Sequence, residues 1–216
     1  MGEKKDVLLT INEIVNSNDS IKETLNLLRK ESFETFSHSL NVAYLVGCYV
    51  HDNVDEFSDV EAIDLITSAL LHDVGKLDLP KGLLEKTTPL TDKEFKTIQK
   101  HSAYSTRIAK KMGYSKDITN LIEFHHYRAN ERSYPVMLPN LKGDATFMKN
   151  LAILSMSDIF SAIVQKRAYK PNRDKDYALN ELKKEYFDVS TFVKFEKMIG
   201  GIEEDYFLDH ADSILT

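Results

Sequence analysis

Apolar side chains recur at helical spacing along most of the chain. Leu8, Ile11, Ile14 and Val15 form a short amphipathic stretch near the N-terminus, because steps of three and four residues return to one helix face. Residues 129–146 hold two prolines and a glycine without this periodicity, so they are expected to form a long loop. Loops of this length inside a compact domain commonly have a function, and one is expected here. Further helices are predicted to begin at Ile21 and to cover residues 33–50, 59–75, 93–112 with a break near His101, 115–127, 147–166, 174–185, 189–200 and 203–214. No strand-like alternation and no repeat is visible, so the pattern predicts a single all-α domain.

Several of these helices carry start and stop signals. Asp59 has the side chain of an N-cap, and Gly75 is expected to end the helix that Asp59 begins. Thr91 and Glu94 have the spacing of a capping box, and Gly113 is expected to stop the helical region that follows. The buried stripe of the helix after Asp59 is expected to comprise Ala62, Ile63, Ile66, Ala69 and Leu70.

Length and composition are those of an ordinary globular chain. Of the 216 residues, 42% are hydrophobic and 29% are charged, which excludes a fibrous or disordered chain. No run approaches about 18 apolar residues, so neither a membrane span nor a membrane partner is expected. Cys48 is the only cysteine. This excludes an internal disulfide and a zinc–cysteine cluster, and it favours a cytoplasmic protein.

The chain is acidic, with a formal net charge of -6 and a pI near 5.7. Binding to DNA or RNA requires a basic face, so neither is expected as a partner. An anionic substrate would need a locally positive site in this acidic chain. Bound metal ions are the usual way to supply one.

Histidines occur where helices are predicted to begin or end. His72 and Asp73 follow a strongly apolar helix, and His101 stands near the start of the next helical region. His125 and His126 are adjacent at the end of a third helix. Such pairs can project two ligands into one cavity from a fixed backbone, so the arrangement favours a metal site.

The carboxylates add to this pattern with unequal strength. Asp158 is the only charged residue between residues 151 and 164, and a buried carboxylate requires a partner or a metal. Glu34 and His38 are four residues apart on one helix face, a spacing that is also common on solvated surfaces. His51 and Asp52 form another His–Asp pair, but a polar loop follows, so they are expected at the surface. Imidazoles and carboxylates without thiolates suit iron or manganese better than structural zinc.

The order of these residues resembles the HD superfamily of metal-dependent phosphohydrolases. More narrowly it resembles the HD-GYP branch, which hydrolyses cyclic dinucleotides, chiefly cyclic di-GMP. The resemblance covers about Phe33 to Phe195 and implies a single HD-type helical bundle. Residues 1–30 are then expected as an N-terminal helical arm and residues 31–216 as the HD-GYP-like domain. The matching blocks are Leu71–Leu77 with Pro80, Leu90–His101, His125–Gly143 and Asp158–Lys170.

By position, the resemblance implies a centre of two or three divalent transition-metal ions, with iron or manganese favoured. The implied metal ligands are His38, His72, Asp73, His101, His125, His126 and Asp158, with Glu34 where some members hold a third metal. Asp73 is the natural bridging ligand, and Lys76 falls on a lysine of phosphate binding and catalysis. Arg128, Arg167 and Lys170 are implied to contact the substrate.

Four positions depart from the family pattern without removing an implied ligand. Ser133 replaces the first glycine of Gly-Tyr-Pro, and Glu131 replaces another expected glycine. Asn130 and Ser161 stand where aspartates are expected. Serine tolerates positive φ poorly, so the shape of the loop and its contacts to guanine stay open.

The resemblance implies a phosphodiesterase in which metal-bound hydroxide attacks a phosphorus of a cyclic dinucleotide, most of all cyclic di-GMP. The alternatives are a metallophosphohydrolase for another nucleotide, a catalytically inactive metal-binding signalling module, and a redox-active di-iron oxygenase. Lys76, Arg167 and Lys170 favour phosphate chemistry over the oxygenase. About 30 residues precede the matching region, too few for a sensor domain, so regulation is expected through a protein partner, through expression, or through metal and redox state. A homodimer stays open.

Overall fold

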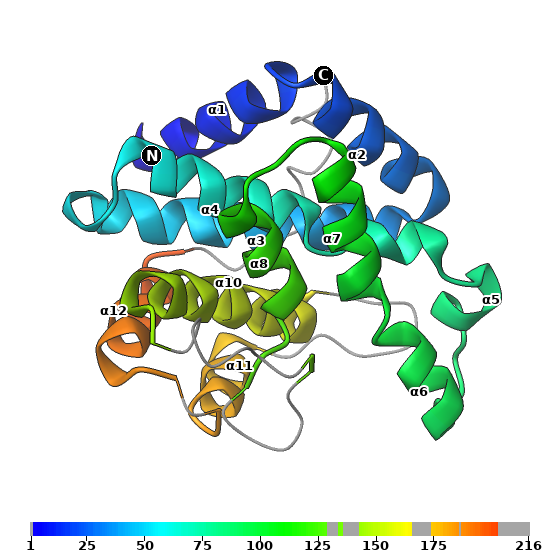
Figure 1. The fold of residues 1–216 in the computed structure, drawn as a ribbon. Coiled ribbons are helices and arrows are strands. Elements are labelled where there is room, and N and C mark those ends of the chain that lie inside the picture. Colours follow the sequence, from blue (N-terminus) through cyan, green and yellow to red (C-terminus); the bar gives the residue numbers. More distant parts are fainter. Residues whose placement is uncertain (1, 129–133, 136–142, 166–173, 186, 203–216) are drawn as a thin grey trace.

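The computed structural model describes residues 2–128, 134–135, 143–165, 174–185 and 187–202, and every regular element in these ranges is a helix (Figure 1). The predicted all-α class is therefore confirmed. In chain order the elements are α1 (Gly2–Asn16), α2 (Asp19–Glu31), α3 (Phe33–Asp52), η1 (Val54–Glu56), α4 (Asp59–Leu71), η2 (Val74–Asp78), α5 (Lys81–Leu84), α6 (Asp92–Ile98), α7 (His101–Lys111), α8 (Lys116–Phe124), α10 (Ala145–Val164), α11 (Lys175–Leu182) and α12 (Val189–Gly200).

Two helices of 20 residues, α3 and α10, form the centre of the bundle. Helix α3 packs against α1, α2, α4 and α10, and α10 also packs against α8, α11 and α12. A helix covered on several sides must be apolar nearly all round, which explains the long hydrophobic run of α3. The residues predicted as an N-terminal arm contribute Ile11, Val15, Leu25 and Leu28 to the same hydrophobic core.

Helix α10 is nevertheless long and apolar enough to cross a membrane by length and composition alone. However, 61% of its most apolar window is buried inside the protein. Its buried face also carries the polar side chains Asn150 and Asp158. Among the described residues, α10 therefore has the character of a core helix.

Several predicted helix ends are confirmed. Thr91 and Glu94 form the capping box of α6, and Gly113 has a φ of 85°, a conformation that glycine adopts readily. The predicted break lies between the end of α6 and His101, the first residue of α7. The predicted helix over residues 203–214 and most of the loop over 129–146 lie outside the described residues.

The limits of α4 differ from the prediction. Ser58, not Asp59, is the N-cap, because Ser58 and Glu61 form a reciprocal capping box. The helix ends at Leu71, so Gly75 does not terminate it. Ile63 is 48% exposed, whereas the part of α4 that packs between α3 and α8 is buried throughout, over residues 65–71.

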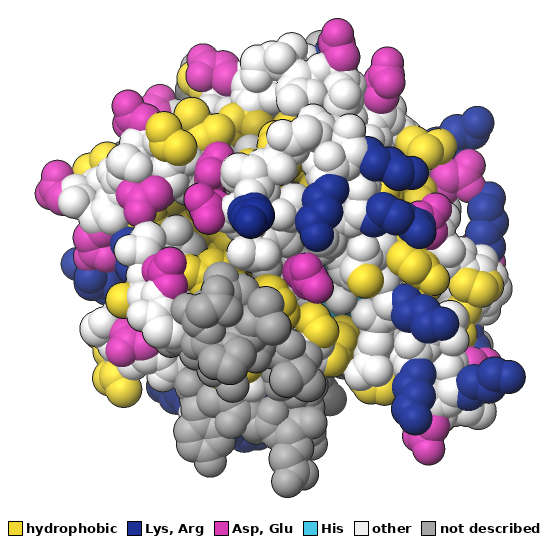
Figure 2. All heavy atoms as spheres, in the orientation of Figure 1, with side chains coloured by type: hydrophobic (Ala, Val, Ile, Leu, Met, Phe, Trp, Pro, Cys, Tyr) yellow, Lys and Arg dark blue, Asp and Glu magenta, His cyan; other side chains and the backbone are white. Residues whose placement is uncertain are grey.

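Basic side chains gather on the face formed by α6 and α7 (Figure 2). Lys100, Arg107, Lys110 and Lys111 are all exposed there. The acidic chain therefore presents a positive strip along the helix that begins with His101. A strip of this sign attracts anions toward that part of the molecule.

Candidate metal centre

Histidines from four helices meet in the interior of the bundle. They are His38 in α3, His72 at the end of α4, His101 at the start of α7, and His125 and His126 at the end of α8. The first four are almost fully buried, and His126 is partly buried. The structure thus brings together the histidines predicted as ligands. The other His–Asp pair, His51 and Asp52, is exposed as predicted.

Three of these imidazoles are oriented by the same backbone contact. The Nδ1 atoms of His72, His101 and His125 each lie 2.7 Å from the carbonyl oxygen three residues earlier. A carbonyl oxygen only accepts, so Nδ1 donates, and Nε2 keeps its lone pair in the neutral ring. Each ring therefore presents Nε2 as a ligand atom, the arrangement that orients histidine in metal sites.

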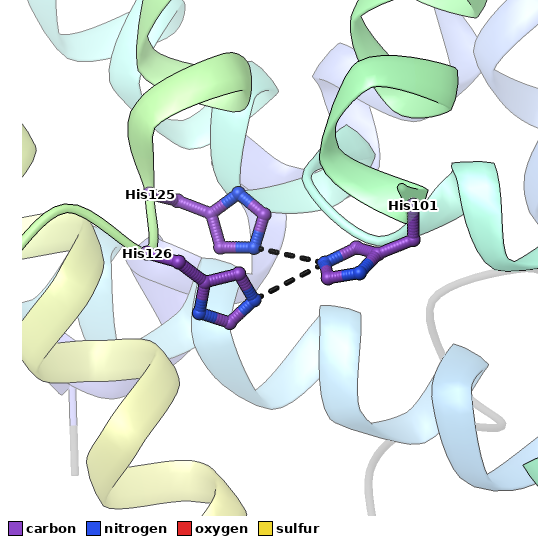
Figure 3. Close-up of side chains that lie close together, drawn as sticks. All are labelled: His101, His125 and His126. Carbon is purple, nitrogen blue, oxygen red and sulfur yellow. Dashed lines mark hydrogen bonds between the residues drawn. The ribbon is translucent and has the colours of Figure 1, made fainter. Parts of the chain in front are cut away.

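The nitrogen atoms presented in this way crowd one another. His125 and His126 point toward His101 from the end of α8 (Figure 3), and Nε2 of His101 lies 3.3 Å from Nε2 of His125 and 3.1 Å from Nε2 of His126. Burial lowers the pKa of His101, and burial together with His72 and His101 lowers the pKa of His125 to about 3. Both rings are therefore neutral at pH 7, and the lone pairs of His101 and His125 face each other. A cation bound between them would remove this repulsion, so the donor set fits a transition metal.

Asp73 lies between the imidazoles of His72 and His101. Its Oδ1 is 3.3 Å from Nε2 of His101, and its Oδ2 is 3.4 Å from Nε2 of His72. Oδ1 of Asp73 and Nε2 of His72 are buried without a hydrogen bond in the described part of the chain. A buried polar atom without a partner lowers the stability of the fold unless a bound ion or molecule interacts with it. Burial raises the pKa of Asp73, but Lys76 and His72 outweigh it and hold the pKa well below its usual range.

Asp158 closes the opposite side of the cluster. Its Oδ1 lies 3.0 Å from Nε2 of His38, and its Oδ2 lies 3.7 Å from Nδ1 of His126. Burial raises its pKa, but His38 and His126 keep the pKa well below the ordinary value. One potential ligand atom from each of His38, His72 and Asp158 lies within 4.8 Å of the others, and the same holds for His72, Asp73 and His125 and for His101, His125 and His126. Three overlapping groups of side chains could therefore each hold a metal ion.

Lys76 approaches the centre without being a ligand. Its Nζ donates to Oδ2 of Asp73 over 2.6 Å, and its side chain is 21% exposed. The Lys76 side chain is therefore directed to Asp73 rather than into solvent. Lys76 and His38 line one cavity of about 380 Å³, which connects the centre to the surface.

Glu34 lines the same cavity as His38 and Lys76. It is partly buried, so the structure places it at the site rather than on a solvated helix face. It is not among the side chains whose ligand atoms lie within 4.8 Å of one another. Its role as ligand of a third ion stays a prediction.

The residues predicted to bind substrate have separate locations. Nη1 of Arg128 donates to the carbonyl oxygens of His125 and Tyr127 over 2.9 and 2.8 Å. Arg128 lines a second cavity, of about 440 Å³, and not the cavity that Lys76 lines. Arg167 and Lys170 lie outside the described residues, as do the altered positions 130, 131 and 133.

Two contacts to the ligands were not predicted. Nδ1 of His38 lies 3.0 Å from Oγ of Ser161, which follows Asp158 by three residues on the same face of α10. The three-residue spacing between Asp158 and Ser161 was the sequence signal from which this contact could have been predicted. Tyr134 stacks on His126, and the ring centroids lie 4.6 Å apart. In the sequence, the position of Tyr134 in the altered Gly-Tyr-Pro block was the only sign of this contact.

Comparison with known proteins shows the family of this chain. Residues 24–188 match the family model described as HD domain. The chain therefore belongs to the HD-domain family, which confirms the resemblance found in the sequence.

Relatives in sequence and neighbours in structure are named as phosphodiesterases. The chain is 28% identical over 152 residues to the 3'3'-cGAMP-specific phosphodiesterase 3 of Vibrio cholerae, covering 69% of this chain and 32% of that protein. It is 29% identical over 196 residues to the cyclic di-GMP phosphodiesterase of Thermotoga maritima, covering 84% of this chain and 50% of that protein. The chain thus spans between a third and a half of these relatives. The HD domain of the L. monocytogenes phosphodiesterase PgpH has the same fold, with a TM-score of 0.61 at 15% identity over 82% of this chain and 94% of that one.

Proposed function

We propose that this protein is a metal-dependent phosphodiesterase that hydrolyses a cyclic dinucleotide, with cyclic di-GMP as the foremost substrate. The observation that carries the proposal is the buried cluster of imidazole nitrogens around Asp73, with the ammonium of Lys76 at 2.6 Å from the same carboxylate. The names of the relatives from V. cholerae and T. maritima support the substrate class.

We propose that this cluster binds two or three divalent ions. Iron or manganese is favoured because the donors are imidazoles and carboxylates. When bound, such ions lower the pKa of a coordinated water and polarise a phosphoryl oxygen. Asp73 has one oxygen toward His101 and the other toward His72, which suits a carboxylate shared by two ions. His38 and Asp158 hold the far side, and Glu34 is the proposed addition for a third ion.

Lys76 and the basic residues act on the substrate. Lys76 lines the cavity and donates to Asp73, and its ammonium is proposed to stabilise the negative charge that develops on the phosphoryl oxygens in the transition state. Arg167 and Lys170 are proposed to orient the phosphates as fixed positive charges. Arg128 is proposed to assist through the backbone of His125, to which it donates.

The direct test is hydrolysis by metal-reconstituted protein. Cyclic di-GMP, cyclic di-AMP, 3'3'-cGAMP and cyclic mononucleotides are each incubated with the protein, and the products are separated by chromatography. Asp73→Asn, which keeps the shape of the side chain, is the inactive control, and exposed Asp52→Asn is the active one.

Cyclic di-GMP is expected to be cleaved fastest. A preference for 3'3'-cGAMP would instead support the second candidate, a phosphodiesterase for mixed cyclic dinucleotides, which the relative from V. cholerae favours. Tight binding without turnover would point to a signalling module. Metal-dependent oxygen consumption without hydrolysis would point to a di-iron oxygenase.

A further inference from the structure

Phe33 is an aromatic side chain that the fold leaves half in solvent. It is the first residue of α3 and is 53% exposed. The helix start does not depend on it, because Ser32 caps α3 by accepting from the amide of Thr35. The core beneath is closed by the fully buried Phe36, whose ring centroid lies 6.0 Å from that of Phe33. Neither capping nor core packing therefore accounts for a large exposed ring at this position.

The ring lines the cavity that leads to the metal centre. His38 and Lys76 line this cavity of about 380 Å³, and Phe33 and Leu84 of α5 are the apolar side chains that line it among the described residues. Lys76 is bound to Asp73 in the centre. A ligand with a phosphate at Lys76 therefore has the Phe33 ring within the same cavity for the group next to that phosphate.

We propose that Phe33 is a stacking platform for a nucleobase of the substrate, next to the phosphate held at Lys76. The inference rests on the proposed function and names a residue that binds the base. Every base has an apolar face that stacks on an aromatic ring, and the loss of one such contact weakens binding by between about 5-fold and 100-fold. Leu84, on the α5 side of the cavity, adds apolar surface against which a flat ring can pack.

Removal of the ring is expected to act on binding rather than on chemistry. Phe33→Ala should raise KM for cyclic di-GMP by between about 5-fold and 100-fold and change kcat little, because the ligands and Lys76 are intact. Phe33→Tyr should restore the wild-type KM, and Phe33→Leu should not, because leucine has bulk but no aromatic face. Leu9→Ala is the matched control, since Leu9 is 50% exposed on α1.

A spectroscopic readout does not depend on turnover. The chain has no tryptophan, so Phe33→Trp introduces a single reporter in the metal-loaded protein. Saturable quenching by GMP, with no quenching by ribose 5-phosphate, is expected because only GMP carries a base. Leu9→Trp should respond to neither.

Two outcomes separate this inference from the function on which it rests. A wild-type protein that hydrolyses cyclic di-GMP, with an unchanged KM in Phe33→Ala and no quenching in Phe33→Trp, overturns the role of Phe33 alone. A wild-type protein that neither binds nor hydrolyses any cyclic dinucleotide overturns the proposed function and this inference with it.

Discussion

At the scale of single residues, the two oxygens of Asp73 face different histidines. Oδ1 approaches His101 and Oδ2 approaches His72, so loss of the carboxylate removes a donor from both sides of the centre. Asp73→Ala is therefore expected to lose metal and phosphodiesterase activity together. Elemental analysis of protein purified without chelators measures the first, and a hydrolysis assay measures the second. Full metal content in this variant would contradict the bridging role, and exposed Asp52→Ala should behave as wild type.

Lys76 makes the complementary case, because it contacts Asp73 but has no lone pair to offer a metal while it is protonated. Lys76→Ala should keep the metal content and lower kcat by about 100-fold or more, the scale of losing one charge-stabilising donor. Lys76→Met is the closer test, because methionine keeps an unbranched side chain without the charge. Loss of metal in either variant would show that the lysine supports the site through its bond to Asp73 instead.

Glu34 is proposed to separate a site of two ions from a site of three. It lines the cavity with His38 and Lys76, and a third ion there would add positive charge for a second phosphate. Glu34→Ala is expected to lose one ion of three and to keep two. It should slow hydrolysis of the linear dinucleotide more than opening of the ring. Two ions at full loading of the wild-type protein, with Glu34 directed to solvent, would defeat the idea.

At the scale of elements, the metal ligands are held by a close contact between η2 and α7. The amide of Gly75 donates to Oγ of Ser105 over 2.8 Å. A Cβ at Gly75 would stand 2.2 Å from the carbonyl oxygen of His101 and 2.3 Å from the amide nitrogen of Ser105. Since these are backbone atoms of α7, any side chain at this position must push the helix away from the turn that carries His72 and Asp73.

Gly75→Ala is therefore expected to lower the free energy of unfolding by roughly 1–3 kcal/mol, as overpacking of a tight core does, and to weaken metal binding through displacement of His101. Thermal unfolding and metal titration measure the two effects. Gly82→Ala in α5 is the control, because no atom lies within 4 Å of the place that a Cβ would take there. Equal stability of the two variants would show that η2 and α7 can separate at little cost.

Helix positions were predictable where the pattern was long, and helix ends were predictable where a side chain caps the backbone. Spacing alone predicts the capping box of Thr91 and Glu94, whereas the pattern does not separate Asp59 from the neighbouring Ser58, because both residue types cap well. The end of α4 was missed for another reason. Gly75 marks a close approach to α7 rather than a helix stop, and that approach exists only in the tertiary structure.

The candidate site followed from the sequence through the order of its histidines and aspartates. The sequence alone did not predict the hydrogen bonds that orient the candidate ligands. The carbonyl contacts of His72, His101 and His125 arise from helix geometry, and Ser161 meets His38 only because α10 packs on α3. Such partners depend on which helices touch, so they become visible only once the bundle is assembled.

At the scale of the whole molecule, the bundle keeps a concentrated group of titratable side chains out of water. Burial is the largest influence on the pKa of His38, His101, His125 and His126, and all four pKa values lie below the ordinary value. For His72, burial acts in the same direction but Asp73 outweighs it, so the pKa of His72 is raised. The interior is thus arranged to keep most of its imidazoles neutral, the form that binds a metal.

This arrangement predicts how the stability of the metal-free protein depends on pH. In the unfolded chain the four depressed histidines take up protons near pH 6.5, whereas in the folded protein they do so only at lower pH, near 3 for His125. The unfolded state therefore binds more protons in this window, and the free energy of unfolding falls as the pH drops from about 6.5 toward 3. His72, with its raised pKa, opposes the trend as a single group. The pKa values of Asp73 and Asp158 are depressed, so their contribution is lost only below about pH 4.

Thermal unfolding of chelator-treated protein between pH 8 and pH 5 is expected to show a Tm that is constant above about pH 7 and falls below it. His51→Ala should leave this curve unchanged, because His51 is exposed. His125→Asn should flatten it, since one of the buried groups that must be protonated on unfolding is gone. Addition of Mn²⁺ should raise Tm most at high pH, because His72, whose pKa is raised, must lose its proton before it can bind the ion. A Tm that is independent of pH in this range would mean that the histidines bind protons as readily in the folded protein as in the unfolded chain. That result would contradict a buried, preorganised centre.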